Sequence, residues 1–253
     1  MEKQVLDHGY VKLIGTMMSE NDLKDCAQSL DEMVVEAARV SYGGGLKGPE
    51  KDKKLLHYLL EHEHGTPFES AVFKFEVKCP MFVMRQWVRH RWGSFNEVSG
   101  RYTEQISEEY YIPKKFRAQD TKNRQGSIDE DLRDKPTTTY LDPNPNSTDP
   151  PCTIAEVYEL VNNFSRRTYE NMIKAGVAKE LARGVLGTAF YTQFVWTVNA
   201  RSLMNFLILR CDSLAQWEIR QYAFVLLEMF KEKMPWAHES LLKLFPSSFK
   251  ETS

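Results

Sequence analysis

The segment from Arg85 to Tyr102, RQWVRHRWGSFNEVSGRY, concentrates side chains that could do chemistry. It holds four arginines against one acid, Glu97, which gives the segment a net charge of +3 in a protein whose formal net charge is −2. A guanidinium can bind phosphate oxygens through two parallel hydrogen bonds, and the backbone N–H groups of a glycine-containing turn add donors. The segment therefore indicates a site for a small ligand that carries phosphate.

The expected local structure groups these side chains. We expect a helix that runs through about Arg91 and an extended run over residues 97–102. In the extended run, Glu97, Ser99 and Arg101 stand at positions i, i+2 and i+4 and should point the same way. A carboxylate and a hydroxyl beside guanidinium groups suit a sugar phosphate.

Two other interpretations of this segment stay open. It could be a solvated basic face with incidental polar residues. It could also be a nucleic-acid patch, in which Trp87, Trp92 and Phe95 stack on bases. The net charge of −2 argues against a general nucleic-acid coat protein, which would be strongly basic.

A second cluster lies in LLHYLLEHEHGT. His57, Glu61 and His64 stand at i, i+4 and i+7, on one face of a predicted helix, and could hold a metal ion. The simpler alternative is an exposed i, i+4 pair with His64 at the end of the helix. The spacing leaves a metal-dependent hydrolase open as a competing class of protein.

A third cluster is WTVNARSLMNFLILRCDS. Asn199 is well placed to cap the N-terminus of a helix. Asn205 stands in a strongly apolar stretch, where a buried amide would need hydrogen-bonding partners. Arg210 could be a favourable charge at a helix C-terminus, and Arg183 an exposed helical arginine, so both have simple structural explanations.

Composition places the chain among ordinary globular proteins. It has 253 residues, of which 42% are hydrophobic and 27% charged, and this excludes a mostly disordered or collagen-like chain. Its four cysteines form no C-x-x-C pair, which favours a reducing compartment. No secretory leader and no membrane-length apolar run is visible, so we expect a soluble, cytoplasmic protein.

Helices dominate the predicted elements. We expect helices near residues 21–40, 50–64, 80–91, 153–174, 178–186, 201–209 and 213–233, and strands near 71–78, 97–102 and 194–199. In the first of these strands, Phe73, Phe75 and Val77 alternate with charged residues. Thr153 and Glu156 predict a capping box at the start of the 153–174 helix, Gln216 stands in the capping-box position of the last helix, and Pro235 should end that helix. No βαβα alternation is present, which argues against a doubly wound parallel sheet. Residues 117–151 hold five of the eleven prolines and few periodic apolar residues, and they predict a long surface loop.

These residues resemble a known family. Arg89-His90-Arg91-x-x-Ser94-x-Asn96-Glu97-x-Ser99 matches the signature of the flavin-dependent thymidylate synthases, the ThyX type, and Gly100-Arg101-Tyr102 continues the match. The similarity extends along the chain through AARVSY, HGTPFE, RQW, YIP, LAR, WTVNARSLMNFL and AQWEIRQYA. Two departures are the long 117–151 loop and the sequence Leu186-Gly187-Thr188-Ala189, where relatives often have Leu-Pro.

The resemblance implies a fold and an activity. The expected fold is α+β, with helices packed around a small, mostly antiparallel sheet in a single domain over residues 1–253. The expected reaction methylates dUMP to dTMP, with carbon from 5,10-methylenetetrahydrofolate and reducing power from NADPH through FAD. The implied assembly is a homotetramer with active sites shared between subunits, and no metal, nucleic-acid or membrane partner is expected.

The resemblance also implies roles for individual positions. The implied FAD contacts are Ser41, Thr66, Arg89, His90, Arg91, Glu97, Asn199, Arg201 and Asn205. The implied dUMP contacts are Gln86, Trp87, Val88, Arg89, Glu97, Val98, Ser99, Gly100, Arg101, Arg183 and Arg210. His64 resembles a residue near the flavin and the folate.

Arg210 is the implied catalytic residue, because it resembles an arginine that contacts the uracil ring and favours ionisation at N3. Loss of the N3 proton pushes electron density toward C5, the atom that must become nucleophilic. A guanidinium stays charged at any working pH and can stabilise the resulting anion. Ser99 has no obvious base among its sequence neighbours, so we assign it to nucleotide binding and not to nucleophilic attack.

Overall fold

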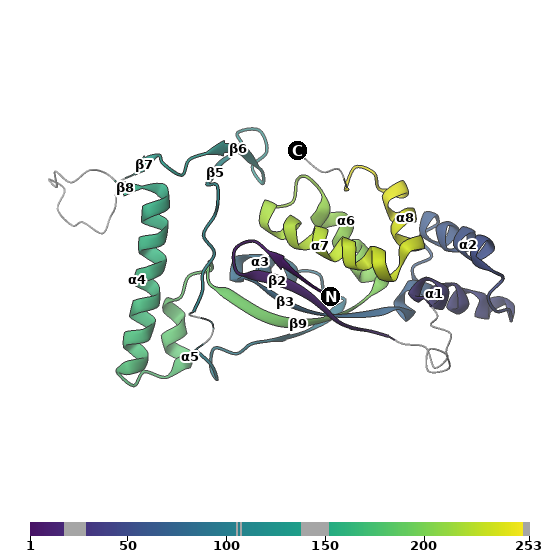
Figure 1. The fold of residues 1–253 in the computed structure, drawn as a ribbon, viewed down its shortest axis with the longest axis horizontal. Coiled ribbons are helices and arrows are strands. Elements are labelled where there is room, and N and C mark those ends of the chain that lie inside the picture. Colours follow the sequence, from purple (N-terminus) through teal and green to yellow (C-terminus); the bar gives the residue numbers. More distant parts are fainter. Residues whose placement is uncertain (18–28, 105, 107, 138–151, 250–253) are drawn as a thin grey trace. The chain divides into compact units, whose positions relative to one another are not determined.

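The computed structural model describes residues 1–17, 29–104, 106, 108–137 and 152–249. The chain divides into two compact units, which we describe separately (Figure 1). The first unit comprises residues 1–79, 83–97 and 193–253. The second unit comprises residues 80–82 and 98–192.

A five-stranded sheet forms the base of the first unit. Its strand order is β1 (Glu2–Val5), β2 (Gly9–Thr16), β3 (Val72–Pro80), β9 (Tyr191–Asn199) and β4 (Gly93–Glu97). The β1–β2, β2–β3 and β4–β9 pairs are antiparallel. Phe73, Phe75 and Val77 of β3 are fully buried, and this confirms the predicted alternation of apolar and polar residues.

Five helices of the first unit pack with this sheet and with one another: α1 (Leu30–Arg39), α2 (Pro49–Glu61), α6 (Ala200–Cys211), α7 (Trp217–Lys233) and α8 (Pro235–Leu244). Helix α7 packs on β1 and β2, and α6 runs beside α7 (Figure 1). Helix α8 packs against both α2 and α7. The predicted mixture of helices with a small antiparallel sheet is confirmed.

An aromatic core fixes the short helix α3 (Met81–Trp87) to the sheet and to α6 and α7. The Trp87 ring is fully buried, with its centroid 4.9 Å from that of Phe206 and 5.3 Å from that of Phe194. The rings of Trp196 and Tyr222 lie 5.5 and 5.9 Å from it. Burial of five large rings contributes most of the stabilisation at this point, at about 1.5–3 kcal/mol for each side chain removed from water.

A buried carboxylate helps to hold α8. Asp31, in the first turn of α1, accepts hydrogen bonds from the backbone N–H groups of Trp236 (2.7 Å) and Ala237 (3.1 Å). These N–H groups belong to the first turn of α8, where a helix has donors without intrahelical partners. Burial raises the pKa of Asp31 to about 7.

The second unit contains one long helix, α4 (Ile154–Lys174), and the shorter α5 (Lys179–Ala182), which runs into the 3₁₀ turn η5 (Arg183–Val185). The predicted capping box of α4 is present: the Thr153 hydroxyl accepts from Glu156 N, and the Glu156 carboxylate accepts from Thr153 N. Gly176, with a φ of +87°, follows the end of α4 in the left-handed conformation that glycine adopts freely.

The predicted strand over residues 97–102 is wrong beyond its first residue. Strand β4 ends at Glu97, and the Ser99 carbonyl then accepts from the backbone N–H groups of Tyr102 (2.9 Å) and Thr103 (3.2 Å). This hydrogen-bonded turn replaces the extended run, so Glu97, Ser99 and Arg101 do not share one strand face.

The helix predicted to reach Arg91 ends earlier. Helix α3 ends at Trp87, where His90 N bonds back to the Trp87 carbonyl, and β4 begins at Gly93. The polar residues after Trp87 thus lie in a connection, because the buried ring anchors the end of the helix in the core.

The long loop predicted over residues 117–151 contains regular structure. Strands β5 (Arg117–Gln119) and β6 (Ser127–Asp131) form an antiparallel hairpin, and β7 (Pro136–Thr137) pairs with β8 (Cys152–Thr153). The remainder of the predicted loop, residues 138–151, lies outside the described residues.

The last predicted helix begins later than expected, and a further helix follows it. Helix α7 begins at Trp217 and not near residue 213, and the side chain of Gln216 makes no capping bond. Pro235 ends α7 as expected, but it also occupies the first position of α8, a helix that we did not predict. Residues 21–28 of the first predicted helix lie outside the described residues. Within the described residues, no helix is long and apolar enough to cross a membrane.

Candidate active site

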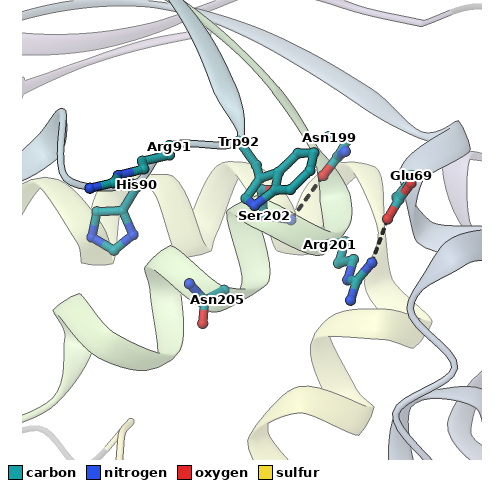
Figure 2. Close-up of a pocket in the computed structure, with 8 residues that line it drawn as sticks. All are labelled: Glu69, His90, Arg91, Trp92, Asn199, Arg201, Ser202 and Asn205. Atoms are coloured by element: carbon teal, nitrogen blue, oxygen red, sulfur yellow. Dashed lines mark hydrogen bonds and ion pairs between the residues drawn. The ribbon is translucent and has the colours of Figure 1, made fainter.

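A cavity of about 310 Å³ opens in the first unit (Figure 2). It is lined by Glu69, His90, Arg91, Trp92, Asn199, Arg201, Ser202 and Asn205. These side chains come from three parts of the chain: the 3₁₀ turn η3 (Thr66–Ser70), the α3–β4 connection, and the start of α6 with its cap.

Antiparallel pairing of β4 with β9 explains why two of these segments meet. The first residue of β4, Gly93, pairs with Val198 near the end of β9. The residues just before β4 therefore lie beside the residues just after Val198. This register brings Arg91 and Trp92 to the same place as Asn199 and the first turn of α6, as Figure 2 shows.

Asn199 has the capping role that the sequence predicted. Its Oδ1 accepts from the backbone N–H of Ser202 at 2.9 Å, which satisfies one of the free donors at the start of α6. Asn199 thus lies at the cavity because α6 begins there. The cap also orients the first turn of α6, which carries Arg201.

Arg201 is oriented by an ion pair and by a close approach to the backbone. Its Nη1 lies 2.5 Å from Oε1 of Glu69. Gly65 permits this placement, because a Cβ at that position would lie 2.5 Å from Arg201 Nε. Both ion-paired side chains are about half exposed, so the pair orients the guanidinium more than it stabilises the fold.

Arg210 and His90 form a second polar pair. Arg210 Nε donates to His90 Nε2 at 3.0 Å, and Arg210 Nη2 donates to the Gln86 carbonyl at 3.5 Å. Burial, and then the nearby Arg210 charge, lower the pKa of His90 to about 4. Since Nε2 accepts, the neutral imidazole carries its proton on Nδ1. Burial also lowers the pKa of Arg210, but a guanidinium remains charged in proteins.

The donor set of the cavity fits a dinucleotide that carries a flavin. The guanidinium groups of Arg91 and Arg201 can bind a pyrophosphate, and the Asn205 amide offers both a donor and an acceptor. The Trp92 ring is 83% exposed at this cavity and offers a flat surface on which a planar ring can stack. The Asn205 side chain is exposed at the cavity, although its helix is strongly apolar, so its amide needs no protein partner.

The other positions implied in the FAD site do not line this cavity. Ser41 is exposed in η2 (Val40–Tyr42), and its hydroxyl donates to the Ala38 carbonyl. Thr66 begins η3, Arg89 is exposed in the α3–β4 connection, and Glu97 ends β4.

His64 is exposed after α2, and its ring meets the edges of two neighbouring rings. The centroid distances are 5.9 Å to Tyr58 and 6.4 Å to His62. Within the described residues, no group of three potential metal ligands comes together, so the geometry gives the hydrolase alternative no support.

The second unit gathers another set of predicted substrate contacts. A Cβ added at Gly100 would lie 3.2 Å from Arg183 Cδ, so the two residues are neighbours. Ser99 Oγ accepts from Arg101 N at 3.3 Å, and Arg101 pairs with Glu180 at 3.7 Å. Ser99, Gly100, Arg101 and Arg183 are therefore together, as the resemblance implied.

The implied dUMP contacts around Trp87 divide by exposure. The Trp87 side chain is part of the core, so only its backbone is placed to contact a ligand. Val88 is exposed and Val98 is half-buried. Burial also excludes Trp87 as one of the three aromatic side chains that the nucleic-acid interpretation expected to stack on bases.

Three cavity residues escaped the sequence analysis as cofactor contacts: Glu69, Trp92 and Ser202. Glu69 ends the motif HGTPFE, and Trp92 occupies an unspecified position inside the signature. The exposed aromatic residue in a run of arginines was a usable signal for Trp92. Ser202 could be found only from the register of α6.

The fold and the site define an α+β protein with an anion-binding cavity suited to a flavin nucleotide. The model of the family described as thymidylate synthase complementing protein matches residues 22–236. The chain therefore belongs to this family.

Individual relatives agree with this assignment. The flavin-dependent thymidylate synthase of Thermosipho africanus is 48% identical over 246 residues, which span 96% of this chain and 95% of that protein. The protein of the same name from Thermotoga neapolitana is 44% identical over 243 residues, spanning 96% of this chain and 95% of that one. Among solved structures, the UMP/dUMP methylase PolB from Streptomyces cacaoi, bound with 5-Br dUMP, matches with a TM-score of 0.71 and 26% identity. That match covers 97% of this chain and all of the other.

Proposed function

We propose that the protein is a flavin-dependent thymidylate synthase, which converts dUMP to dTMP by reductive methylation. The methylene carbon comes from 5,10-methylenetetrahydrofolate, and NADPH supplies the electrons through FAD. The observation that carries the proposal is the cavity of Figure 2, which is lined by two guanidinium groups, an amide and an exposed indole, and one of the two arginines, Arg91, belongs to the signature.

The cavity residues hold the cofactor. Arg91 and Arg201 would bind phosphate oxygens of the cofactor, while Asn205 would hydrogen-bond to one of its polar edges and Trp92 would stack on a planar ring. A bound flavin supplies hydride transfer, which no amino-acid side chain can perform. Glu69 acts through Arg201, because its carboxylate fixes the direction of that guanidinium.

Arg210 stabilises the negative charge that develops on the uracil ring. Among the described residues its partners are Gln86 and His90, which leaves three of its five N–H groups for a ligand. Because His90 is uncharged, it orients Arg210 without neutralising the charge of the guanidinium. A carboxylate partner would neutralise that charge. The full positive charge thus remains available to the substrate.

The second-unit cluster binds the nucleotide phosphate. Arg101 and Arg183 supply guanidinium donors, and Ser99 and the backbone at Gly100 add neutral ones. We further propose a homotetramer in which different chains supply Arg101 and Arg210 to one active site.

Spectroscopy tests the cofactor part of this proposal. The purified chain should give flavin absorption bands when FAD is supplied, and these bands should bleach when NADPH and dUMP are added without oxygen. The Arg210→Ala variant should retain the bands but lose about 10²-fold or more in turnover, as removal of one charge-stabilising donor typically does. Failure to bind FAD would reject the proposal, and full turnover in Arg210→Ala would reject the role of that residue.

A further inference from the structure

A line of hydrogen bonds connects a buried carboxylate to a predicted substrate contact. Glu218, in the first turn of α7, is only 3% exposed. Its Oε2 accepts from Gln216 Nε2 at 2.9 Å. Gln216 Oε1 in turn accepts from Gln86 Nε2 at 2.5 Å. The three residues thus form a relay, Glu218–Gln216–Gln86, which lies wholly within the first unit.

The chemistry of the carboxylate gives this relay a direction. An ionised carboxylate can only accept hydrogen bonds, so Gln216 must turn its NH₂ group toward Glu218. The amide oxygen of Gln216 then faces Gln86, which must turn its own NH₂ group toward Gln216. Gln86 Oε1 consequently points away from the relay and is the end of the amide that a ligand meets.

Gln86 also contacts Arg210, the predicted catalytic residue. The backbone carbonyl of Gln86 accepts from Arg210 Nη2 at 3.5 Å. Arg210 can only donate, whereas Gln86 Oε1 can only accept. A ligand that contacts both residues therefore meets a donor, the Arg210 guanidinium, and an acceptor, Gln86 Oε1. Glu218 determines, through Gln216, that the oxygen and not the nitrogen of the Gln86 amide faces the ligand.

We propose that Gln216 and Glu218 are positioning residues, which fix the orientation of the Gln86 amide so that its oxygen accepts from an N–H or O–H group of the bound nucleotide. The inference rests on the proposed function, because it takes Gln86 as a dUMP contact. It assigns a task to Gln216, the N-cap residue of α7, and to Glu218 in the first turn of that helix, neither of which lines the cavity.

The size of the effect follows from the exposure of the relay. Gln216 is exposed and Gln86 half-buried, so water can replace their hydrogen bond. Loss of the relay should therefore weaken dUMP binding by about 2- to 10-fold, the range of one ordinary hydrogen bond, without abolishing it.

A double-mutant cycle tests the relay. The dissociation constant of dUMP would be measured by calorimetry on the FAD-supplemented full chain, for wild type, Gln216→Ala, Gln86→Ala and the double variant. We expect Gln216→Ala to weaken binding in the wild-type background and to have no further effect once Gln86 is alanine. Glu218→Gln should weaken binding in the same way, because a neutral amide no longer dictates the orientation of Gln216.

Controls separate positioning from stability. Gln221→Ala removes another amide of α7, which donates to the Trp217 carbonyl and lies outside the relay, and it should leave dUMP binding unchanged. The melting temperature and the flavin spectrum of Gln216→Ala should match those of the wild type. An equal effect of Gln216→Ala in both backgrounds, or no effect in either, would overturn the inference. Wild-type protein that binds no dUMP would instead reject the proposed function itself.

Discussion

The Arg210–His90 pair combines a charge that persists with a partner that stays neutral. Burial and the adjacent guanidinium hold the pKa of His90 near 4, well below its usual 6.5. At neutral pH the imidazole therefore accepts from Arg210 Nε and adds no charge. A residue that orients a cation without neutralising it suits a site where an anion must develop.

This arrangement predicts a pH dependence of stability. Because the pKa of His90 is lower in the folded chain, the unfolded chain takes up the proton first as the pH falls. The contribution of neutral His90 to the free energy of unfolding is fully present above about pH 6.5. It is lost progressively as the pH drops from 6.5 to about 4. His90→Asn should therefore flatten the fall in the free energy of unfolding over this interval, as followed by urea denaturation. An unchanged slope in the variant would contradict the assignment.

Trp92 gives a second prediction at this scale. Its ring is 83% exposed at the cavity, which is costly unless a ligand covers it. Stacking of an aromatic side chain on a planar ring is worth about 1–3 kcal/mol, so Trp92→Ala should weaken FAD binding by about 5- to 150-fold. Trp92→Phe should retain most of the affinity. Fluorescence titration with FAD measures both variants, and equal affinity of Trp92→Ala and wild type would remove Trp92 from the site.

At the scale of elements, the glycine before η3 controls the direction of Arg201. A Cβ at Gly65 would lie 2.5 Å from Arg201 Nε and 2.8 Å from Cζ, so the guanidinium must move. Because the obstructed group is the end of a flexible side chain, Gly65→Ala should cost less than about 1 kcal/mol of stability. It should nevertheless weaken FAD binding, because the displaced guanidinium leaves Glu69.

Gly44→Ala is the matched control for this prediction. No atom lies within 4 Å of a Cβ built at Gly44, so this variant should bind FAD as the wild type does. The same fluorescence titration would measure the FAD dissociation constants of Gly65→Ala and Gly44→Ala. Equal affinity of Gly65→Ala and Gly44→Ala would contradict the positioning role of Gly65.

The predicted elements succeeded where local signals agree with packing. The alternation in β3, the Thr153–Glu156 capping box and the Asn199 cap all follow from short-range chemistry, and all three are present. The extended run predicted after Glu97 failed because the Ser99 carbonyl closes a turn that alternation cannot reveal.

Helix α8 was missed for a related reason. We interpreted Pro235 only as the end of α7, although proline also suits the first position of the next helix. The buried Asp31 carboxylate that caps α8 comes from a residue more than two hundred positions earlier, so sequence neighbours could not indicate it.

For the molecule as a whole, the sequence predicted many of the residues of the candidate site, but it did not predict the shape of the cavity. The signature identified Arg91, and the distant WTVNARSLMNFL motif identified Asn199, Arg201 and Asn205. Glu69 and Ser202 escaped because the cavity depends on the β4–β9 register and on the Gly65–Arg201 approach. Both features depend on tertiary structure, so no local sequence pattern could indicate them.

The proposed sharing of active sites between chains predicts complementation. Arg101 and Arg210 belong to different clusters, and each is proposed to contact the substrate, so a chain with Arg101→Ala and a chain with Arg210→Ala should each lose most of their activity when expressed alone. Co-expressed with different affinity tags and purified through both tags, the mixed oligomer should recover a measurable fraction of wild-type activity, since some of its sites contain both arginines. Mixed oligomers without any activity would contradict a shared site.

A single-turnover experiment tests whether this chain transfers the folate carbon to dUMP at the expense of reduced flavin. The FAD-loaded protein would be reduced without oxygen, freed of excess NADPH, and mixed with dUMP and 5,10-methylenetetrahydrofolate. We expect the flavin absorption to return while dTMP forms in an amount equal to the flavin oxidised, and we expect neither change when the folate is omitted. A flavin that stays reduced, with no dTMP formed, would contradict the assignment of this chain as a flavin-dependent thymidylate synthase.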